Sequence, residues 1–387
     1  MFKPSRLDHL DLLRGLAAFL VLAGHLRAYT FQSFLDLDKA GAQLSALVKA
    51  FYFATGLGHQ AVMIFFALSG FLVGGKALDD VLAYRFSWSH YLLRRLTRLW
   101  IVIVPALLLT LVLDRIGSEL TSGVGYDGRY YDLYLEGPRA PPGVDHSMRA
   151  FFGNLVFLQT IYAPTFGSNG PMWSLANEFW YYIVFPLVGW IVLARVSWVG
   201  RSAALSILLA LIVLLPVWLL EGGVIWLVGA ASAWCSRQQP FGRLLKNIAL
   251  RIGAVLVFVA ALIASKTPAI GIGDLELGLA IALILPIFAH MPSPGGTYSS
   301  AARGLSEISY TLYLTHFPFL TTIVMVGIAP MRWPPSLEAA GIYAALLSAA
   351  TAWAAIVWWC FERNTDSVYF TLSNKLPSPE NVSVRAQ

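Results

Sequence analysis

Two ionisable side chains, Arg14 and His25, interrupt the first apolar stretch of this sequence. On a helix, their separation of 11 residues is three turns plus about 20°, so they share a face and lie about 16 Å apart along the axis. Ionisable groups at membrane depth are costly and mark functional sites. The arginine would bind or shape an anionic group, and the imidazole would serve as a general base near neutral pH. The alternative is that Arg14 snorkels to the interface and His25 hydrogen-bonds a neighbouring helix.

A basic row begins at His90 and continues with Arg94 and Arg98, each one helical turn further along, with Arg95 beside it. Guanidinium groups match phosphate oxygens in bidentate geometry, so a helical row of them can hold several phosphates. We interpret the row as a clamp for a phosphate-bearing donor from the cytosol. The alternative is an ordinary cluster of cations at the inner end of a membrane helix.

Two further groups fall near or inside apolar segments. Glu178 follows irregular backbone around Gly170 and Pro171, at a depth similar to that of His25. A carboxylate there would orient the imidazole or stabilise its charged form; alternatively, the helix dipole favours an acid at that position. His316 precedes Pro318, which is expected to kink its helix and free backbone carbonyls, so His316 also has an ordinary structural explanation.

The elements that carry these residues are apolar helices. Of the 387 residues, 57% are hydrophobic and 12% charged, with a mean hydropathy of +0.66. This composition excludes a disordered chain and almost any soluble enzyme, and it predicts an all-α polytopic membrane protein. About ten segments are long enough to cross a bilayer, and a shorter run at 150–162 is expected to be re-entrant or interfacial. The segments are 10–28, 57–77, 98–114, 174–194, 203–220, 222–236, 248–265, 274–290, 305–328 and 338–360.

The distribution of Lys and Arg predicts that both termini face the cytoplasm, because more of these cations then lie in inside segments. The basic pI of about 9.3 is explained by these helix-end cations, not by nucleic acid binding. The expected domains are a membrane domain at 1–365 and a short cytoplasmic tail at 366–387, with the first helix retained. Cys235 and Cys360 are expected to be reduced thiols. No histidine or cysteine has metal-ligand spacing, and no phosphate loop or serine-nucleophile elbow occurs.

Five stretches, taken in order, resemble the acyltransferase 3 family of membrane-bound acyltransferases, which includes O-acetylases of lipopolysaccharide and other surface sugars. Each stretch alone is weak, but together they cover the membrane core. Phe179 and Trp180 depart from the family pattern, which often has a second acid or Gln there. The stretches are Leu10 to Gly15 with His25, Phe65 to Leu72, Arg94 to Arg98, Gly170 to Glu178, and Ser309 to Pro318.

This resemblance implies transfer of an acyl group, with acetyl favoured, from cytosolic acyl-CoA to a hydroxyl of a sugar or glycolipid, by a multi-pass protein of the bacterial inner membrane. Arg14, Arg94, Arg95 and Arg98 would then hold the donor. His25 would act as general base and Glu178 would support it; a covalent acyl-histidine is a variant of this scheme. Ser69, Tyr313 and His316 are candidates for polarising the thioester carbonyl or contacting substrate.

A transporter or flippase for an anionic solute is the alternative function, since it would use the same arginines and intramembrane histidine. The single-sided arginine row and the absence of an internal repeat argue against it. A receptor or structural membrane protein is a further alternative, and it would tolerate replacement of His25 and Glu178. The sequence does not indicate the acceptor sugar or the oligomeric state.

Overall fold

A computed structural model describes residues 7–134, 143–193, 197–267 and 270–376, and it is helical with no strands over these ranges. The first half comprises α1 (Asp8–Thr30), α2 (Phe34–Lys39), α3 (Ala46–Thr55), α4 (Gly58–Ser69), the π-helix η1 (Gly70–Gly74), α5 (Gly75–Leu82), α6 (Trp88–Leu120), α7 (Tyr131–Tyr134), α8 (Met148–Leu155), η2 (Gly170–Met172) and α9 (Trp173–Leu193). The second half comprises α10 (Trp198–Leu214), α11 (Val217–Ser236), α12 (Gln239–Leu244), α13 (Ile248–Ala264), α14 (Asp274–His290), α15 (Gly296–Gly327), α16 (Leu337–Cys360), η3 (Glu362–Asn364) and α17 (Thr365–Ser373).

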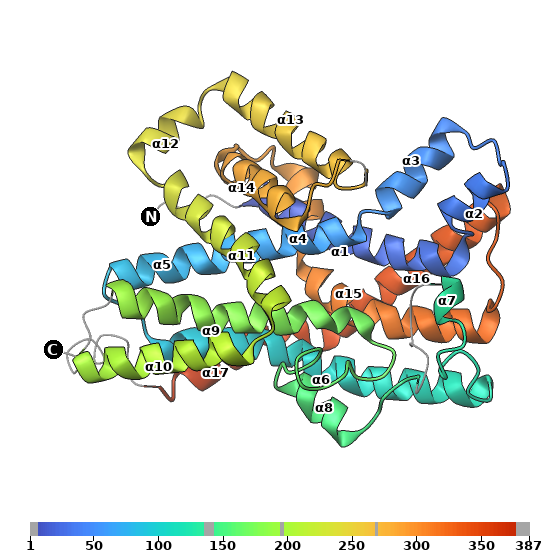
Figure 1. Cartoon of the computed structure of the whole chain (residues 1–387), viewed down its shortest axis with the longest axis horizontal. Coiled ribbons are helices and arrows are strands. Elements are labelled where there is room, and N and C mark those ends of the chain that lie inside the picture. Colours follow the sequence, from blue (N-terminus) through green and yellow to red (C-terminus); the bar gives the residue numbers. More distant parts are fainter. Residues whose placement is uncertain (1–6, 135–142, 194–196, 268–269, 377–387) are drawn as a thin grey trace.

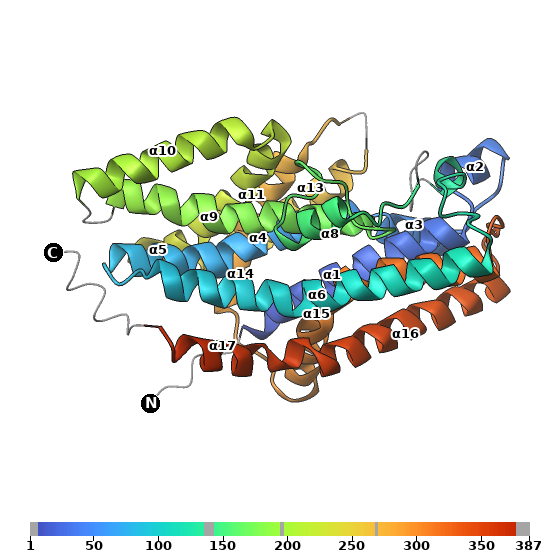
Figure 2. The same ribbon diagram turned by 90° about the horizontal axis from the view of Figure 1, so that it is seen from below.

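Helices α1 and α15 form the centre of the bundle. Helix α1 packs against α15, α4 and α16, while α15 also contacts α6 (Figure 1). Figure 2 shows α16 and α17 along one side of the molecule and α10 along the opposite side. The chain therefore brings its N-terminal and C-terminal thirds together at the centre, where sequence-distant side chains meet.

Among the described residues, six helical runs are long and apolar enough, by length and composition, to cross a membrane. Within the described residues, each predicted segment lies mostly on one or more helices, and α10 and α13 are shorter apolar helices. These helices indicate a multi-pass membrane protein, while the count of about ten spans and their orientation stay predictions. The short run at 150–162 begins as α8 and continues in turns. The six runs are Asp8–Thr30, Gly58–Leu82, Trp88–Leu120, Gly170–Leu193, Val217–Ser236 and Leu337–Ser373.

One predicted boundary was wrong. The segment 203–220 was expected to be continuous, but α10 ends at Leu214 and α11 begins after Pro216. Proline lacks the N–H that would continue the helix and disfavours helical backbone in the residue before it. Leu215 is accordingly extended, with φ −84° and ψ 138°.

Prolines inside two helices leave backbone carbonyls that other elements satisfy. Pro318 has no N–H to donate to the Leu314 carbonyl, and the Asn169 side-chain amide donates to that oxygen at 2.9 Å. Pro286 likewise has no N–H to donate to the Ala282 carbonyl, and the Ser232 hydroxyl donates to that oxygen at 2.7 Å. As expected, Pro318 leaves a carbonyl of α15 free. The hydrogen bond from Asn169 to this carbonyl links the segment before α9 to α15.

Small residues allow α4 and η1 to approach α11 closely. A Cβ added at Gly70 would lie 1.9 Å from the Trp226 carbonyl oxygen, and one added at Gly229 would lie 2.1 Å from that of Ala67. Close backbone approach through small residues is the usual packing mode of membrane helices. The π-helical turn at η1 begins at Gly70, directly after Ser69, and such turns often mark functional sites.

Gly70→Ala should therefore force α4 and α11 apart and lower the free energy of unfolding by about 1–3 kcal/mol, as overpacking does. Gly304→Ala is the matched control, because a Cβ at Gly304 meets nothing within 4 Å. The midpoint of thermal unfolding in detergent measures the stability of both variants. Equal midpoints for Gly70→Ala and the wild type would contradict the close packing of these helices.

The predicted topology can be tested with the native cysteines. Cys360 is exposed and Cys235 is partly exposed, and both are free thiols. If both termini face the cytoplasm, a membrane-impermeant maleimide should label Cys360 in inverted vesicles and leave it unlabelled in intact cells. The variant Cys235→Ser isolates the Cys360 signal. Labelling of Cys360 from the outside of intact cells would contradict the predicted orientation.

Candidate functional site

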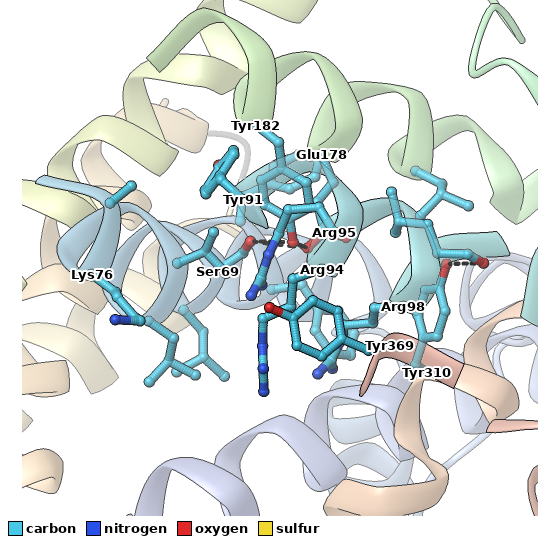
Figure 3. Close-up of a pocket in the computed structure, with 18 of the residues that line it drawn as sticks. Ser69, Lys76, Tyr91, Arg94, Arg95, Arg98, Glu178, Tyr182, Tyr310 and Tyr369 are labelled. Carbon is cyan, nitrogen blue, oxygen red and sulfur yellow. Dashed lines mark hydrogen bonds between the residues drawn. The ribbon is translucent and has the colours of Figure 1, made fainter. Parts of the chain in front are cut away.

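A cavity of about 1050 Å³ opens between α4, α5, α6, α9, α15 and α17. It collects most of the residues that the sequence singled out. Arg14, Arg94, Arg95, Arg98, Ser69, Glu178 and Tyr313 all line it, whereas His25 and His316 do not. Figure 3 shows the arginines of α6 facing Ser69, Glu178 and Tyr182 across this space.

The lining is strongly cationic. It contains two carboxylates, Asp80 and Glu178, and Asp80 is already paired with Lys76 at 3.2 Å and Arg85 at 3.0 Å. The cationic residues of the lining are Arg14, Lys76, Arg85, Arg94, Arg95 and Arg98. A cavity with this excess of positive charge attracts and binds anions.

Three of the four arginines of α6, namely Arg94, Arg95 and Arg98, lie on adjacent turns at the cavity and make few contacts with the protein. Arg94 lies 3.7 Å from Asp366 and over the ring of Tyr369, with 4.9 Å from its Cζ to the ring centroid. Arg95 lies over the ring of Tyr182 at 5.8 Å, and its Nε is buried without a hydrogen-bond partner among the described residues. Arg98 interacts electrostatically with Glu362 and Glu178. Many of their donors are therefore available to a ligand.

A hydroxyl–carboxylate cluster lies at the other wall of the cavity. Ser69 donates to a Glu178 carboxylate oxygen at 2.9 Å, and the Tyr182 hydroxyl donates to the same oxygen. Trp226 donates its indole N–H to Ser69 at 3.2 Å. Glu178 and Tyr182 are one turn apart on α9, so their side chains meet on one face. The carboxylate also interacts electrostatically with Arg14.

Arg14 connects α1 with α15 at this cavity. It lies 3.7 Å from Asp11 and donates to Ser306 at 3.1 Å, while Ser306 donates to Asp11 at 3.0 Å. The expected pairing of Arg14 with Asp11 is confirmed. Arg14 therefore has one carboxylate neighbour on its own helix, and it lines the cavity from α1.

His25 meets His316 at a second position along the same helix pair. Their rings are stacked with centroids 5.4 Å apart, and the edge of Phe317 packs against His25 at 4.9 Å. His316 is fully buried. Arg14 meets Ser306 and His25 meets His316, so the shared face predicted for Arg14 and His25 is directed at α15.

The hydrogen bonds of His316 define its tautomer. Its Nδ1 lies 2.7 Å from the Leu312 carbonyl oxygen, which can only accept, so Nδ1 carries the proton when the ring is neutral. Nε2 then bears a lone pair and has no partner among the described residues. Such a nitrogen accepts a proton, so His316 in this state does not polarise a carbonyl by donation.

Tyr313 connects the two groups of residues. It lines the cavity, and its ring centroid lies 6.3 Å from that of His316. Its hydroxyl is already engaged, with 2.7 Å to the Ser174 hydroxyl and 3.0 Å to the Pro171 carbonyl. The Glu178 carboxylate accepts from Ser69 and Tyr182 and lines the cavity, which His25 does not line, so the support of His25 by Glu178 stays a prediction.

Sequence reasoning missed several functional candidates. Tyr182 could have been found from its i+4 spacing to Glu178. Tyr369 lies on α17, within the segment expected to be a cytoplasmic tail. Asp114 is fully buried and accepts from Ser168 and His146, at 2.7 Å from the Ser168 N–H and 2.9 Å from the imidazole. The carboxylate partner of His146 lies 32 residues away, so the residues next to His146 in the sequence do not reveal the pair.

The helices and the cavity define a multi-helix membrane protein with a cationic cavity beside a carboxylate–hydroxyl cluster. A family model described as an acyltransferase domain matches residues 7–359, and the chain belongs to this acyltransferase family. The resemblance inferred from the sequence motifs is thus confirmed.

The acyltransferase MdmB of Streptomyces mycarofaciens is 28% identical to this chain over 211 residues. The alignment covers 53% of this chain and 46% of that relative, so the match spans less than half the relative's length. No solved structure matches the chain. The family and this relative support an acyltransferase activity.

Glu178→Gln tests the cluster. The amide oxygen would still accept from Ser69 and Tyr182, but the negative charge beside Arg14 and Arg98 would be lost. We expect at least a tenfold loss of acyltransferase activity with little change in thermal stability. Glu276→Gln, at the start of α14 and outside the cavity, is the control. Full activity of Glu178→Gln would show that the carboxylate charge has no role.

Proposed function

We propose that this protein is a membrane O-acyltransferase that moves an acyl group, with acetyl favoured, from cytosolic acyl-CoA to a hydroxyl of a sugar or glycoconjugate. The expected acceptor is a cell-surface polysaccharide or its lipid-linked precursor, at the bacterial inner membrane. The observation that carries the proposal is the arginine row of α6, whose donors face the cavity with few protein partners.

The charge balance of the cavity suits the donor. Acyl-CoA carries a diphosphate and a separate ribose phosphate, and guanidinium groups bind such oxygens by charge-assisted hydrogen bonds. Arg94, Arg95 and Arg98 occupy successive positions along α6, so they can contact phosphates spaced along an extended ligand. Phe65, Leu68 and Leu72 provide an apolar wall for the arm that carries the thioester.

The acyl end would point toward Tyr313, because that residue lies where the cavity approaches His316. His25 and His316 then lie beyond the Tyr313 ring, with His25 partly exposed and His316 buried. A movement of the Tyr313 side chain would open the cavity toward the two histidines. Glu178 is assigned to the donor cavity, where it holds Ser69 and Tyr182 and balances the arginine charge.

In the proposed reaction, the acceptor hydroxyl oxygen attacks the thioester carbonyl carbon. The C–O bond forms and the C–S bond breaks, while the hydroxyl proton passes to His25 and the released CoA thiolate is reprotonated from the histidine. The neutral His316 presents an Nε2 lone pair close to His25, so it can share the proton. Neutral imidazole is the reactive form of this pair.

Release of free thiol from acetyl-CoA tests the activity. The purified protein in liposomes, supplied with a glycolipid extract of its host, should release thiol only when the extract is present. His25→Ala should abolish this release, whereas His59→Ala should not, since His59 forms an exposed ion pair with Asp274 outside the cavity.

Two results would contradict the proposal. Undiminished thiol release by His25→Ala would remove the histidine from the reaction. Binding of acetyl-CoA without thiol release, under any acceptor tested, together with its movement across the liposome membrane, would instead support the transporter alternative.

The arginine row can be tested separately. Arg94→Ala combined with Arg98→Ala should raise the KM for acetyl-CoA by about 100-fold or more, since each lost charge-assisted hydrogen bond is worth about 1.5–3 kcal/mol. The KM for the acceptor should stay within about twofold. Arg243→Ala, a basic residue outside the cavity, is the control. Equal changes in both KM values would point to a disturbed fold.

A further inference from the structure

Helix α17 packs beside α6 at the cavity and is exposed over most of its surface. Val368, Phe370 and Leu372 are exposed, with Phe370 58% accessible. Asp366 and Tyr369 are one turn apart and both lie near Arg94. Tyr369 is partly buried and lines the cavity. Figure 3 shows the Tyr369 ring beside Arg94, close to the arginine row.

We propose that Tyr369 and Arg94 form a nucleobase subsite that takes the purine end of the donor. This inference rests on the proposed function, because it names the part of acyl-CoA that α17 would recognise. The sequence motifs described above end at Pro318 and do not include α17.

Two flat groups define the subsite. The Arg94 guanidinium carbon lies 4.9 Å from the centre of the Tyr369 ring, and the Asp366 carboxylate lies 3.7 Å from the same guanidinium. A purine can stack on either flat group, and arginine planes and tyrosine rings both serve as stacking platforms for bases. Asp366 restrains Arg94 in this position.

The order of groups along the cavity matches the order of groups along the donor. Tyr369 and the flat face of the half-exposed Arg94 would hold the base, while the N–H groups of Arg94, together with Arg95 and Arg98 along α6, would contact the phosphates. Ser69 and Tyr313 line the part reached by the arm. A base bound at any deeper position would displace the phosphates from the arginines.

Helix α17 also lies outside the residues matched by the family model, which ends at residue 359. Base recognition would therefore come from a segment that follows the family domain, whereas phosphate contacts come from within it. The two contributions can be separated by using fragments of the donor.

Equilibrium binding of three probes to the purified full-length protein tests the subsite. The probes are CoA, adenosine 3′,5′-bisphosphate and 4′-phosphopantetheine. Tyr369→Ala should weaken the first two by about tenfold, within the range known for loss of base–aromatic stacking, and leave 4′-phosphopantetheine unchanged. Tyr369→Phe should bind all three normally. Phe370→Ala, on the exposed face of the same helix, should also be unchanged.

An equal loss of all three probes in Tyr369→Ala, or the same loss in Phe370→Ala, would show that Tyr369 only docks α17 and would overturn the subsite. Unchanged CoA binding in Tyr369→Ala would overturn it as well, while leaving the proposed donor intact. If the wild-type protein binds neither CoA nor 4′-phosphopantetheine, the proposed function itself fails, and the subsite fails with it.

Discussion

The positive charge of the α6 arginines is the constraint on which the rest of the structure depends. Three guanidinium groups inside a helical bundle are costly unless carboxylates or ligands approach them. The carboxylates come from separate parts of the chain: Glu178 from α9, Glu362 from η3 and Asp366 from α17. The positions of these elements around α6 are therefore set by charge as well as by apolar packing.

The packing of α1 against α15 positions Arg14 at the cavity and brings the two histidines together. Arg14 meets Ser306 at the cavity, and His25 meets His316 farther along the same two helices. Pro318 contributes indirectly, because the carbonyl it leaves free binds Asn169 and so anchors the segment that leads into α9. The same helix pair thus positions the donor cavity, the carboxylate Glu178 and the histidine pair relative to one another.

Much of the fold could be predicted because apolar runs in a membrane protein correspond directly to helices. The break at Pro216 was not predicted, because hydropathy is averaged over a long window and a single proline changes that average little. The arginine row was predictable from spacing within one helix. The site was less predictable, because depth along the bilayer normal does not define the rotation of a helix about its axis. The depth of Glu178 does not indicate that its carboxylate accepts from Ser69 on α4 and from Tyr182 on α9, because those contacts depend on how the two helices are rotated.

The most direct test of the account is the position of the bound donor, determined by electron cryomicroscopy of the full-length protein with acetyl-CoA. Phosphate density is expected beside Arg94, Arg95 and Arg98, with the acyl end between Ser69 and Tyr313. Donor density at any other surface, with the arginine cavity free of it, would contradict the central claim.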